Sequence, residues 1–375
     1  MKTRLRIFLA AAIGLCLMTA SHRARAADDV VIGAAMSLSG PYAAYGEDGK
    51  TGIDLAVDEI NRKGGVLGRK LRVEYDDSAG DRAKAVALYR KYGADPRIVG
   101  DLFISSSEFV ALDPAAKEVK LPLVSIGSVI PYKDFSPWSF RVQLIVSKAM
   151  GPVLSQVKAL KGAKSIAVIY DTANNATVAE QEAVKGAAPG VGLELKGAES
   201  FRTGDQDFSA QLTNVAAQKP DLLYVAATSN EAALIISQAR EMGINTPILG
   251  GAPLNDPKIG DLAGKSAYGV MTFASYSPKE DRLAVKEFLA LYKQKTGKGN
   301  PPIYVSLGYD SVGLLAQAVT RAGSTDREAI RKALGSTKDF DGVNGKFTYD
   351  GSGDNLRQEP RILVFGPHGF EPLTQ

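Results

Sequence analysis

DLFISSSEFVALDPAAKEVKLPLVSIGS, residues 101–128, decides the fold class of this chain. Two apolar runs, at about 99–104 and 121–126, are each followed at once by small polar residues. The segment between them has the pattern of a helix, so the stretch predicts a strand, a helix and a second strand. In a parallel sheet both polar breaks lie at the carboxyl ends of strands, where open α/β folds bind ligands.

The first polar break has two interpretations. Ser105, Ser106 and Ser107 followed by Glu108 match a helix N-cap with an acidic residue in the first turn. The same hydroxyl groups, together with the N–H groups at a helix start, suit an anion such as a carboxylate. This stretch alone does not decide between capping and binding.

The first 26 residues have the pattern of a secretory signal peptide. A basic start precedes an apolar run at 7–20, and Ala24 and Ala26 supply small residues for cleavage before Ala27. The run is short for a membrane span. Cys16 follows Leu15, whereas a lipid-anchor signal needs a small residue there. We therefore expect an exported protein that is neither lipid-anchored nor embedded in a membrane.

The composition of residues 27–375 excludes several function classes. These residues hold no cysteine, so thiolate metal sites lack their ligands, and the single histidine, His368, lies in a Pro-His-Gly turn near the end, which does not favour a Ser-His-Asp triad. Without the signal, 40 basic residues stand against 41 acidic ones, a balance that does not indicate nucleic-acid binding. We expect no enzyme activity, no metal and no cofactor.

Apolar runs and amphipathic segments alternate along the chain. The expected strands are 30–36, 71–75, 99–104, 121–126, 165–170, 193–195, 221–226, 247–250 and 269–274, with late strands at 345–349 and 362–365. Helical segments separate most of them, and the alternation restarts near residue 147. This pattern predicts an α/β protein with two parallel-sheet lobes.

Five segments are the most specific parts of a resemblance to a known family: 38–46, 60–71, 75–77, 207–208 and 308–310. The resemblance covers essentially the whole chain after the signal, and the family is the periplasmic substrate-binding proteins of branched-chain amino acid ABC importers. It implies a type I periplasmic binding fold, in which two lobes, each a parallel sheet flanked by helices, close on a ligand like a hinged clamp.

The same resemblance implies the domain organisation and the partners. It places lobe 1 at 27–145 and 276–358, and lobe 2 at 146–275 and 359–375, with crossings near 143–146, 274–276 and 358–361. We expect a periplasmic monomer that delivers a small-molecule ligand to an ABC permease and its ATPase subunits. A ligand-sensing module of a receptor system is the alternative from another class.

Residue by residue, the resemblance assigns the carboxylate anchor and the aromatic wall to lobe 1. Ser105 matches the serine that holds the ligand carboxylate, while the family's threonine in the second turn falls at Val129, with Ser128 as the alternative hydroxyl. The expected contacts in this lobe are Tyr45, Phe103, Ser105, Ser106, Gly127, Ser128, Val129 and Tyr304.

Lobe 2 departs from the amino-acid-binding pattern. The family's two tyrosines fall at Asn175 and Thr228, and its glutamate, which faces the ligand ammonium, falls at Ala252. Because an enclosed ammonium without its counter-charge costs about 3–5 kcal/mol, we expect a ligand without an amine. A small carboxylate with an apolar, aromatic body fits, such as a benzoate-like, aryl 2-oxo or phenylpropanoid acid. Another acidic residue in the cleft, for example Glu231, would return the prediction to a hydrophobic, branched-chain amino acid.

Overall fold

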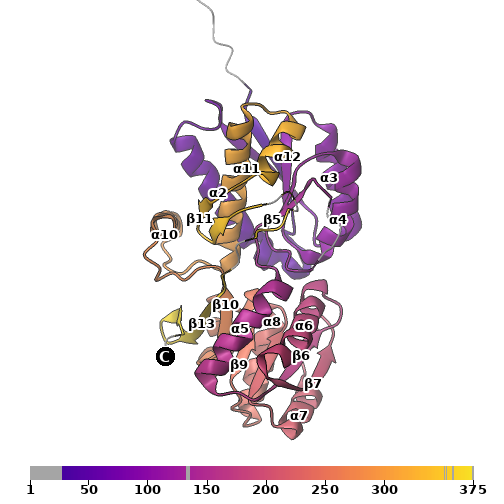
Figure 1. Ribbon diagram of the computed structural model, residues 1–375, viewed down its shortest axis with the longest axis vertical. Helices are drawn as coiled ribbons and strands as arrows, with labels where there is room; N and C mark the ends of the chain where they lie inside the picture. Colours follow the sequence, from indigo (N-terminus) through magenta and orange to yellow (C-terminus); the bar gives the residue numbers. More distant parts are fainter. Residues whose placement is uncertain (1–27, 132–135, 350, 352, 357–358, 374–375) are drawn as a thin grey trace, which may run out of the picture.

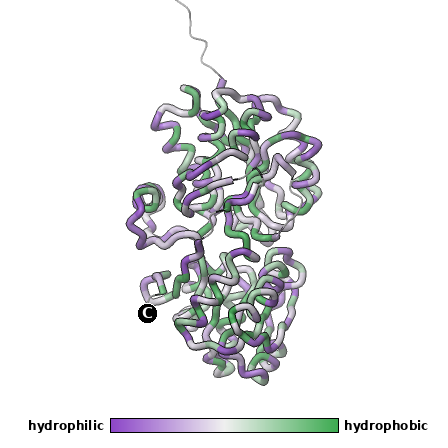
Figure 2. Tube along the Cα trace, in the orientation of Figure 1, coloured by the Kyte–Doolittle hydropathy of each residue, from purple (hydrophilic) through white to green (hydrophobic). Residues whose placement is uncertain are grey.

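A computed structural model shows two α/β lobes arranged end to end (Figure 1). It describes residues 28–131, 136–349, 351, 353–356 and 359–373. The predicted signal peptide therefore lies outside the described residues. Hydrophobic residues follow the central strands of both lobes, and many outer turns are hydrophilic (Figure 2). The two-lobed α/β class predicted from the sequence is confirmed.

Lobe 1 is built on a parallel sheet with the strand order β2-β1-β3-β4-β5. Its strands are β1 (Val30–Met36), β2 (Leu71–Asp77), β3 (Ile98–Phe103), β4 (Leu123–Ser125) and β5 (Ser139–Arg141). β1 is buried along its whole length, as expected for a strand with helices on both faces. Alternate residues of β1 serve the two faces, with Ile32 in one hydrophobic core and Val31 in the other.

Helices cover both faces of this sheet. They are α2 (Ala43–Arg62), α3 (Arg82–Ala94), α4 (Ser106–Val119), α11 (Ile303–Ala322) and α12 (Arg327–Gly335), and α10 (Leu283–Thr296) packs at the side. α2 and α11 share the core that contains Ile32, whereas α3 and α4 share the core that contains Val31. A short antiparallel pair, β11 (Phe340–Gly342) and β12 (Gly345–Phe347), completes the lobe.

Lobe 2 is built on a sheet with the order β14-β13-β10-β9-β8-β6-β7. Its parallel strands are β6 (Ser165–Asp171), β7 (Glu194–Phe201), β8 (Leu222–Ala226), β9 (Ile248–Gly250) and β10 (Met271–Ala274), and the hairpin β13 (Arg361–Gly366) and β14 (Gly369–Pro372) adds an antiparallel edge. The helices of this lobe are α5 (Val146–Lys161), α6 (Asn175–Ala187), α7 (Ser209–Gln218), α8 (Ser229–Glu241) and α9 (Lys258–Ala263). Among the described helices, none is long and apolar enough to cross a membrane.

The chain passes between the two sheets in three connections: β5 to α5, β10 to α10, and β12 to β13. The predicted crossings near 143–146, 274–276 and 358–361 fall in these connections, and of the last one residues 357–358 lie outside the described residues. We keep the predicted lobe boundaries as our proposal for the domains.

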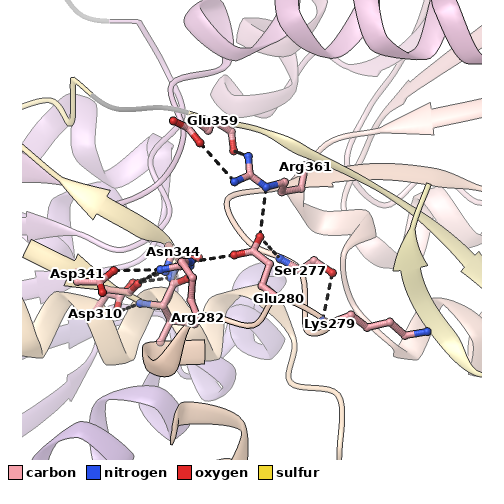
Figure 3. Close-up of polar contacts among 11 residues, drawn as sticks. Ser277, Lys279, Glu280, Arg282, Asp310, Asp341, Asn344, Glu359 and Arg361 are labelled. Atoms are coloured by element: carbon pink, nitrogen blue, oxygen red, sulfur yellow. Dashed lines mark hydrogen bonds and ion pairs between the residues drawn. The ribbon is translucent and has the colours of Figure 1, made fainter. Parts of the chain in front are cut away.

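One carboxylate links two of these connections (Figure 3). Glu280, which follows β10, accepts hydrogen bonds from Arg282 Nε at 2.9 Å and from Arg361 Nε at 3.2 Å. It also accepts the backbone N–H of Ser277 at 3.0 Å. Because Arg361 begins β13, Glu280 ties the second crossing to the end of the third.

Candidate ligand-binding site between the lobes

A pocket lies between the lobes, where the carboxyl ends of both parallel sheets meet. Residues that follow β3, β4, β6, β8 and β9 line it, which is the position expected for ligand binding in such sheets. Its lining from lobe 1 is Tyr42, Tyr45, Ile104, Ser105, Ser106, Gly127, Val129 and Tyr304, and from lobe 2 Asn174, Ala176, Thr177, Glu180, Thr228, Ala252 and Pro253.

Ser105 caps helix α4. Its Oγ accepts the backbone N–H of Glu108 at 3.1 Å and its backbone N–H donates to Glu108 Oε2 at 3.3 Å, so the two residues form a complete capping box. The Ser105 hydroxyl also donates to Glu108 Oε2 at 2.8 Å. Glu108 also accepts hydrogen bonds from Ser37 and Ser78. Burial raises the pKa of its carboxyl, and these hydrogen bonds oppose the shift. The hydroxyl proton of Ser105 is therefore engaged within lobe 1.

Ser106 connects the polar turn after β3 with the polar turn after β4. Its Oγ accepts the backbone N–H of Val129 at 3.1 Å, and its own proton has no acceptor among the described residues. The backbone N–H groups of Ser106 and Ser107 belong to the first helical turn, where an α-helix offers no acceptor. This end of the pocket therefore offers hydrogen-bond donors that suit a carboxylate.

Two tyrosines form an aromatic wall in lobe 1. The rings of Tyr45 and Tyr304 lie 4.7 Å apart between centroids and are tilted by 30°. Tyr304 packs so closely on the second polar break that a Cβ at Gly127 would lie 2.8 Å from its Cε1 and 2.5 Å from the carbonyl oxygen of Ile104. Glycine at this position therefore lets the ring reach the pocket.

Tyr45 also connects the lobes directly. Its hydroxyl oxygen accepts the backbone N–H of Ser229 at 2.9 Å and lies 3.3 Å from Ser229 Oγ. Ser229 is the first residue of α8 in lobe 2, so a side chain of lobe 1 satisfies an N–H group at the start of this helix. A second bridge runs from Arg82 Nη2 to Asn175 Oδ1 at 2.9 Å. The lobes are therefore in contact across the pocket.

Glu180 brings a carboxylate into the pocket from α6. The residue is 3% exposed, and its Oε2 accepts a hydrogen bond from the Tyr224 hydroxyl at 3.1 Å. Burial raises the pKa of Glu180 to about 8. No lysine or arginine is among the described residues that line the pocket.

Sequence reasoning missed Glu180, although a signal for it exists. Ala176, Thr177 and Glu180 all line the pocket, and their spacing places them on one face of α6. Helical periodicity, applied from the polar turn after β6 into α6, would have predicted that Glu180 faces the cleft. The carboxylate lies beside Gly251, where a Cβ would be 2.1 Å from Glu180 Oε1.

Three predicted contact residues do not line the pocket. Phe103 stacks on Phe109 in the core under α4, with centroids 5.8 Å apart, because alternate residues of a strand point to opposite faces and Ile104 takes the pocket side. Ser128 is fully buried. Asn175 bonds to Arg82, and its neighbour Asn174 lines the pocket.

Glu231, the acidic residue proposed from sequence as a replacement counter-charge, has a structural role. It accepts hydrogen bonds from the Thr228 hydroxyl and from the backbone N–H of Gly204, the latter at 3.1 Å, and does not line the pocket. The other predicted residues, Tyr45, Ser105, Ser106, Gly127, Val129, Thr228, Ala252 and Tyr304, are brought together. Within the described parts of the chain, no group of His, Cys, Asp or Glu side chains could hold a metal ion.

Comparison with known proteins identifies the family. The sequence profile described as periplasmic binding protein matches residues 29–362. Leu/Ile/Val-binding protein BraC3 of Rhizobium johnstonii is 30% identical over 348 residues, 88% of this chain and 90% of the relative. Leu/Ile/Val-binding protein homolog 1 of Brucella abortus is 27% identical over 332 residues, 87% of each chain.

Solved structures agree with this assignment. The leucine-binding protein LivK from Thermotoga maritima superposes with a TM-score of 0.85 at 27% identity, covering 92% of this chain and 98% of the other. LivJ from Streptococcus pneumoniae, solved in complex with isoleucine, gives 0.82 at 26% identity with the same coverage. The chain therefore belongs to the periplasmic binding proteins, and within them to the type I family of the branched-chain amino acid importers.

Proposed function

We propose that this protein captures an α-amino acid with an apolar side chain and delivers it to the permease of an ABC importer. One observation carries the choice of ligand. The pocket has hydrogen-bond donors for a carboxylate on its lobe 1 side and the Glu180 carboxylate on its lobe 2 side. A zwitterion matches both ends, with its own carboxylate toward Ser106 and its ammonium toward Glu180.

This proposal reverses the expectation of an aromatic carboxylate without an amine. That expectation depended on Ala252, where the resemblance places a glutamate, and on the absence of another acidic group in the cleft. The second condition is not met, because Glu180 is an acidic group in the pocket. A ligand with a carboxylate and no ammonium would find no basic residue among the described pocket lining and would have to keep Glu180 protonated, whereas an ammonium gives the ionised glutamate a counter-charge.

The remaining lining favours an apolar side chain. Ile104, Val129 and Pro253 add aliphatic surface to the two tyrosine rings. Burying such surface stabilises a complex by about 25 cal/mol per Å². The similar LivJ structure contains isoleucine, and a relative from Pseudomonas aeruginosa, 26% identical, is named for binding leucine, isoleucine, valine, threonine and alanine.

A thermal-shift screen followed by calorimetry tests this proposal. Residues 27–375 are unfolded and refolded to remove any bound ligand, and then mixed with leucine, isoleucine, valine and phenylalanine, or with benzoate, benzoylformate and coumarate. A ligand at about 100 times its Kd adds roughly 2.7 kcal/mol of stability. We expect this shift with at least one aliphatic amino acid. A shift with the aromatic acids and none with any amino acid would restore the earlier expectation.

A further inference from the structure

We propose that Glu180, reaching in from helix α6, is the group that binds the ammonium of the ligand, so that the counter-charge of this pocket comes from a helix rather than from the loop after β9. This inference rests on the proposed function, because it assigns one residue to the recognition of an α-amino acid. It also explains how the pocket works with alanine at position 252.

The hydrogen bonds of Glu180 leave room for a ligand. Tyr224, on the buried strand β8, donates to Oε2 and fixes the position of the carboxylate. Oε1 accepts no hydrogen bond from any described residue of the chain. Since Glu180 lines the pocket, this second oxygen is available to an ammonium group placed there.

Two other buried carboxylates, Glu108 and Asp310, are satisfied internally, whereas Asp101 keeps one oxygen without a hydrogen-bond partner among the described residues but does not line the pocket. Glu108 accepts hydrogen bonds from three serine hydroxyls and a backbone N–H. Asp310 accepts from the backbone N–H of Val343 and Asn344 and from the Asn344 side chain, at 2.8–2.9 Å. Glu180 has one hydroxyl donor and faces a pocket without a basic residue. When Glu180 is ionised, no basic residue among the described pocket lining supplies its counter-charge, and a ligand ammonium would do so.

The loop after β9 is shaped around this carboxylate. Any side chain at Gly251 would collide with Glu180 Oε1, because a Cβ there would lie 2.1 Å away. Ala252, the next residue, lines the pocket with a single methyl group. Glu180 and position 252 therefore share one corner of the pocket, and a glutamate at position 252 would place a carboxylate in that corner from a different element.

A matched pair of ligands isolates the ammonium group. Leucine and 4-methylpentanoate have the same carboxylate and the same aliphatic body, and they differ in the amine alone. We expect the wild type to prefer leucine in calorimetric titrations. In Glu180→Gln the leucine affinity should fall roughly 100- to 1,000-fold, whereas 4-methylpentanoate should bind equally well or better. The glutamine keeps an oxygen for the Tyr224 hydroxyl, so the fold is retained, which circular dichroism and the melting temperature check.

Two further variants complete the experiment. Glu182→Gln, an exposed change two residues along the same helix, is the control and should leave both affinities unchanged. Glu180→Gln combined with Ala252→Glu should recover part of the preference for leucine. Equal leucine affinity in the wild type and in Glu180→Gln would overturn this inference and leave the proposed function intact. Failure of the folded wild type to bind any α-amino acid would overturn the proposed function itself.

Discussion

The hydroxyl groups at the start of α4 have separate tasks. The Ser105 hydroxyl donates its proton to Glu108. The Ser106 hydroxyl accepts the backbone N–H of Val129, and its own proton is available to a ligand in the pocket. We therefore predict that Ser106→Ala lowers ligand affinity by about tenfold or more, since a hydrogen bond to a charged group contributes about 1.5–3 kcal/mol. Ser105→Ala should instead lower the free energy of unfolding by about 1 kcal/mol through loss of the cap.

Calorimetric titration and urea unfolding of both variants separate the two effects. Ser107→Ala, in the same turn, is the comparison for a change that touches neither the cap nor the Val129 N–H. If Ser105→Ala lowered affinity more than Ser106→Ala, the division of tasks would be wrong and the cap residue would be the anchor.

The raised pKa of Glu180 predicts a pH dependence of binding. With a pKa of about 8 in the empty pocket, the carboxyl holds its proton at lower pH, and an ammonium ligand has to displace that proton. Leucine affinity should therefore rise as the pH increases toward about 8, by at most about tenfold per pH unit, and then level off. Titrations between pH 5.5 and 8.5 measure this slope, and Glu180→Gln should remove it.

The stability of the ligand-free protein should respond in the opposite direction. The folded protein holds the Glu180 proton more tightly than the unfolded chain, in which the pKa is near 4.5. The contribution of this residue to the free energy of unfolding is therefore greatest at low pH, and it decreases as the pH rises between about 4.5 and about 8.

An affinity for leucine that does not change over this range would contradict the protonation of Glu180 in the empty pocket.

At the scale of elements, the closed pocket depends on the contact between α2 and α8. Tyr45 in α2 accepts the first N–H of α8, so Tyr45→Phe keeps the ring beside Tyr304 and removes the acceptor. We expect the affinity to fall about 5- to 10-fold, because one hydrogen bond that holds the lobes together is lost. Titration measures the affinity, and small-angle scattering with leucine measures closure. Tyr75→Phe, whose hydroxyl bonds to Asp54 within lobe 1, is the matched control. Equal affinities for both variants would show that the interlobe hydrogen bond contributes nothing to closure.

Strands with an apolar run could be predicted from the sequence, including the edge strands β2 and β7 in part, whereas the shortest edge strands could not. β1 was predicted with its observed bounds because a buried parallel strand is a continuous apolar run. β5 and β14 were missed. They have three and four residues and lie at the edges of their sheets, so they carry no run long enough to stand out.

The visibility of strands in the sequence also explains which pocket residues could be predicted. Gly127, Thr228 and Ala252 directly follow strands, and strand ends are visible in the sequence. Glu180 lies more than a turn inside α6, and its direction depends on how that helix is rotated against the rest of lobe 2. The prediction of Phe103 as a pocket residue is wrong for a related reason. A choice between Phe103 and Ile104 requires knowing which face of β3 meets the cleft.

At the scale of the whole molecule, the proposed function makes ligand affinity and lobe closure one equilibrium. Tyr45 with Ser229 and Arg82 with Asn175 already join the lobes, so the described arrangement is the closed one. A ligand enclosed between the lobes adds contacts to both sides and shifts the population toward this arrangement. Under this proposal the crossing connections allow that movement while keeping the two lobes aligned.

The Glu280 network gives a test of this alignment that does not touch the pocket. Glu280 joins Arg361 of β13 to Arg282, and Arg282 also donates to the carbonyl oxygens of Gly342 and Val343 in lobe 1 (Figure 3). Glu280→Gln removes the carboxylate that Arg282 and Arg361 share, while Arg282 keeps its ion pair with Asp341 and Arg361 keeps its ion pair with Glu359. We predict a loss of about 1 kcal/mol in the free energy of unfolding, in keeping with partly exposed ion pairs. The leucine-induced gain in stability should be unchanged, because no contact of the pocket is altered.

Lys279→Ala is the control for this variant, since Lys279 pairs with Glu371 on the exposed surface and should have no measurable effect. Urea unfolding with and without leucine measures both quantities. A smaller leucine-induced increase in the free energy of unfolding in Glu280→Gln than in the wild type would contradict the prediction. It would mean that the network forms only when the lobes close, because a contact present in both arrangements cancels from the difference between them.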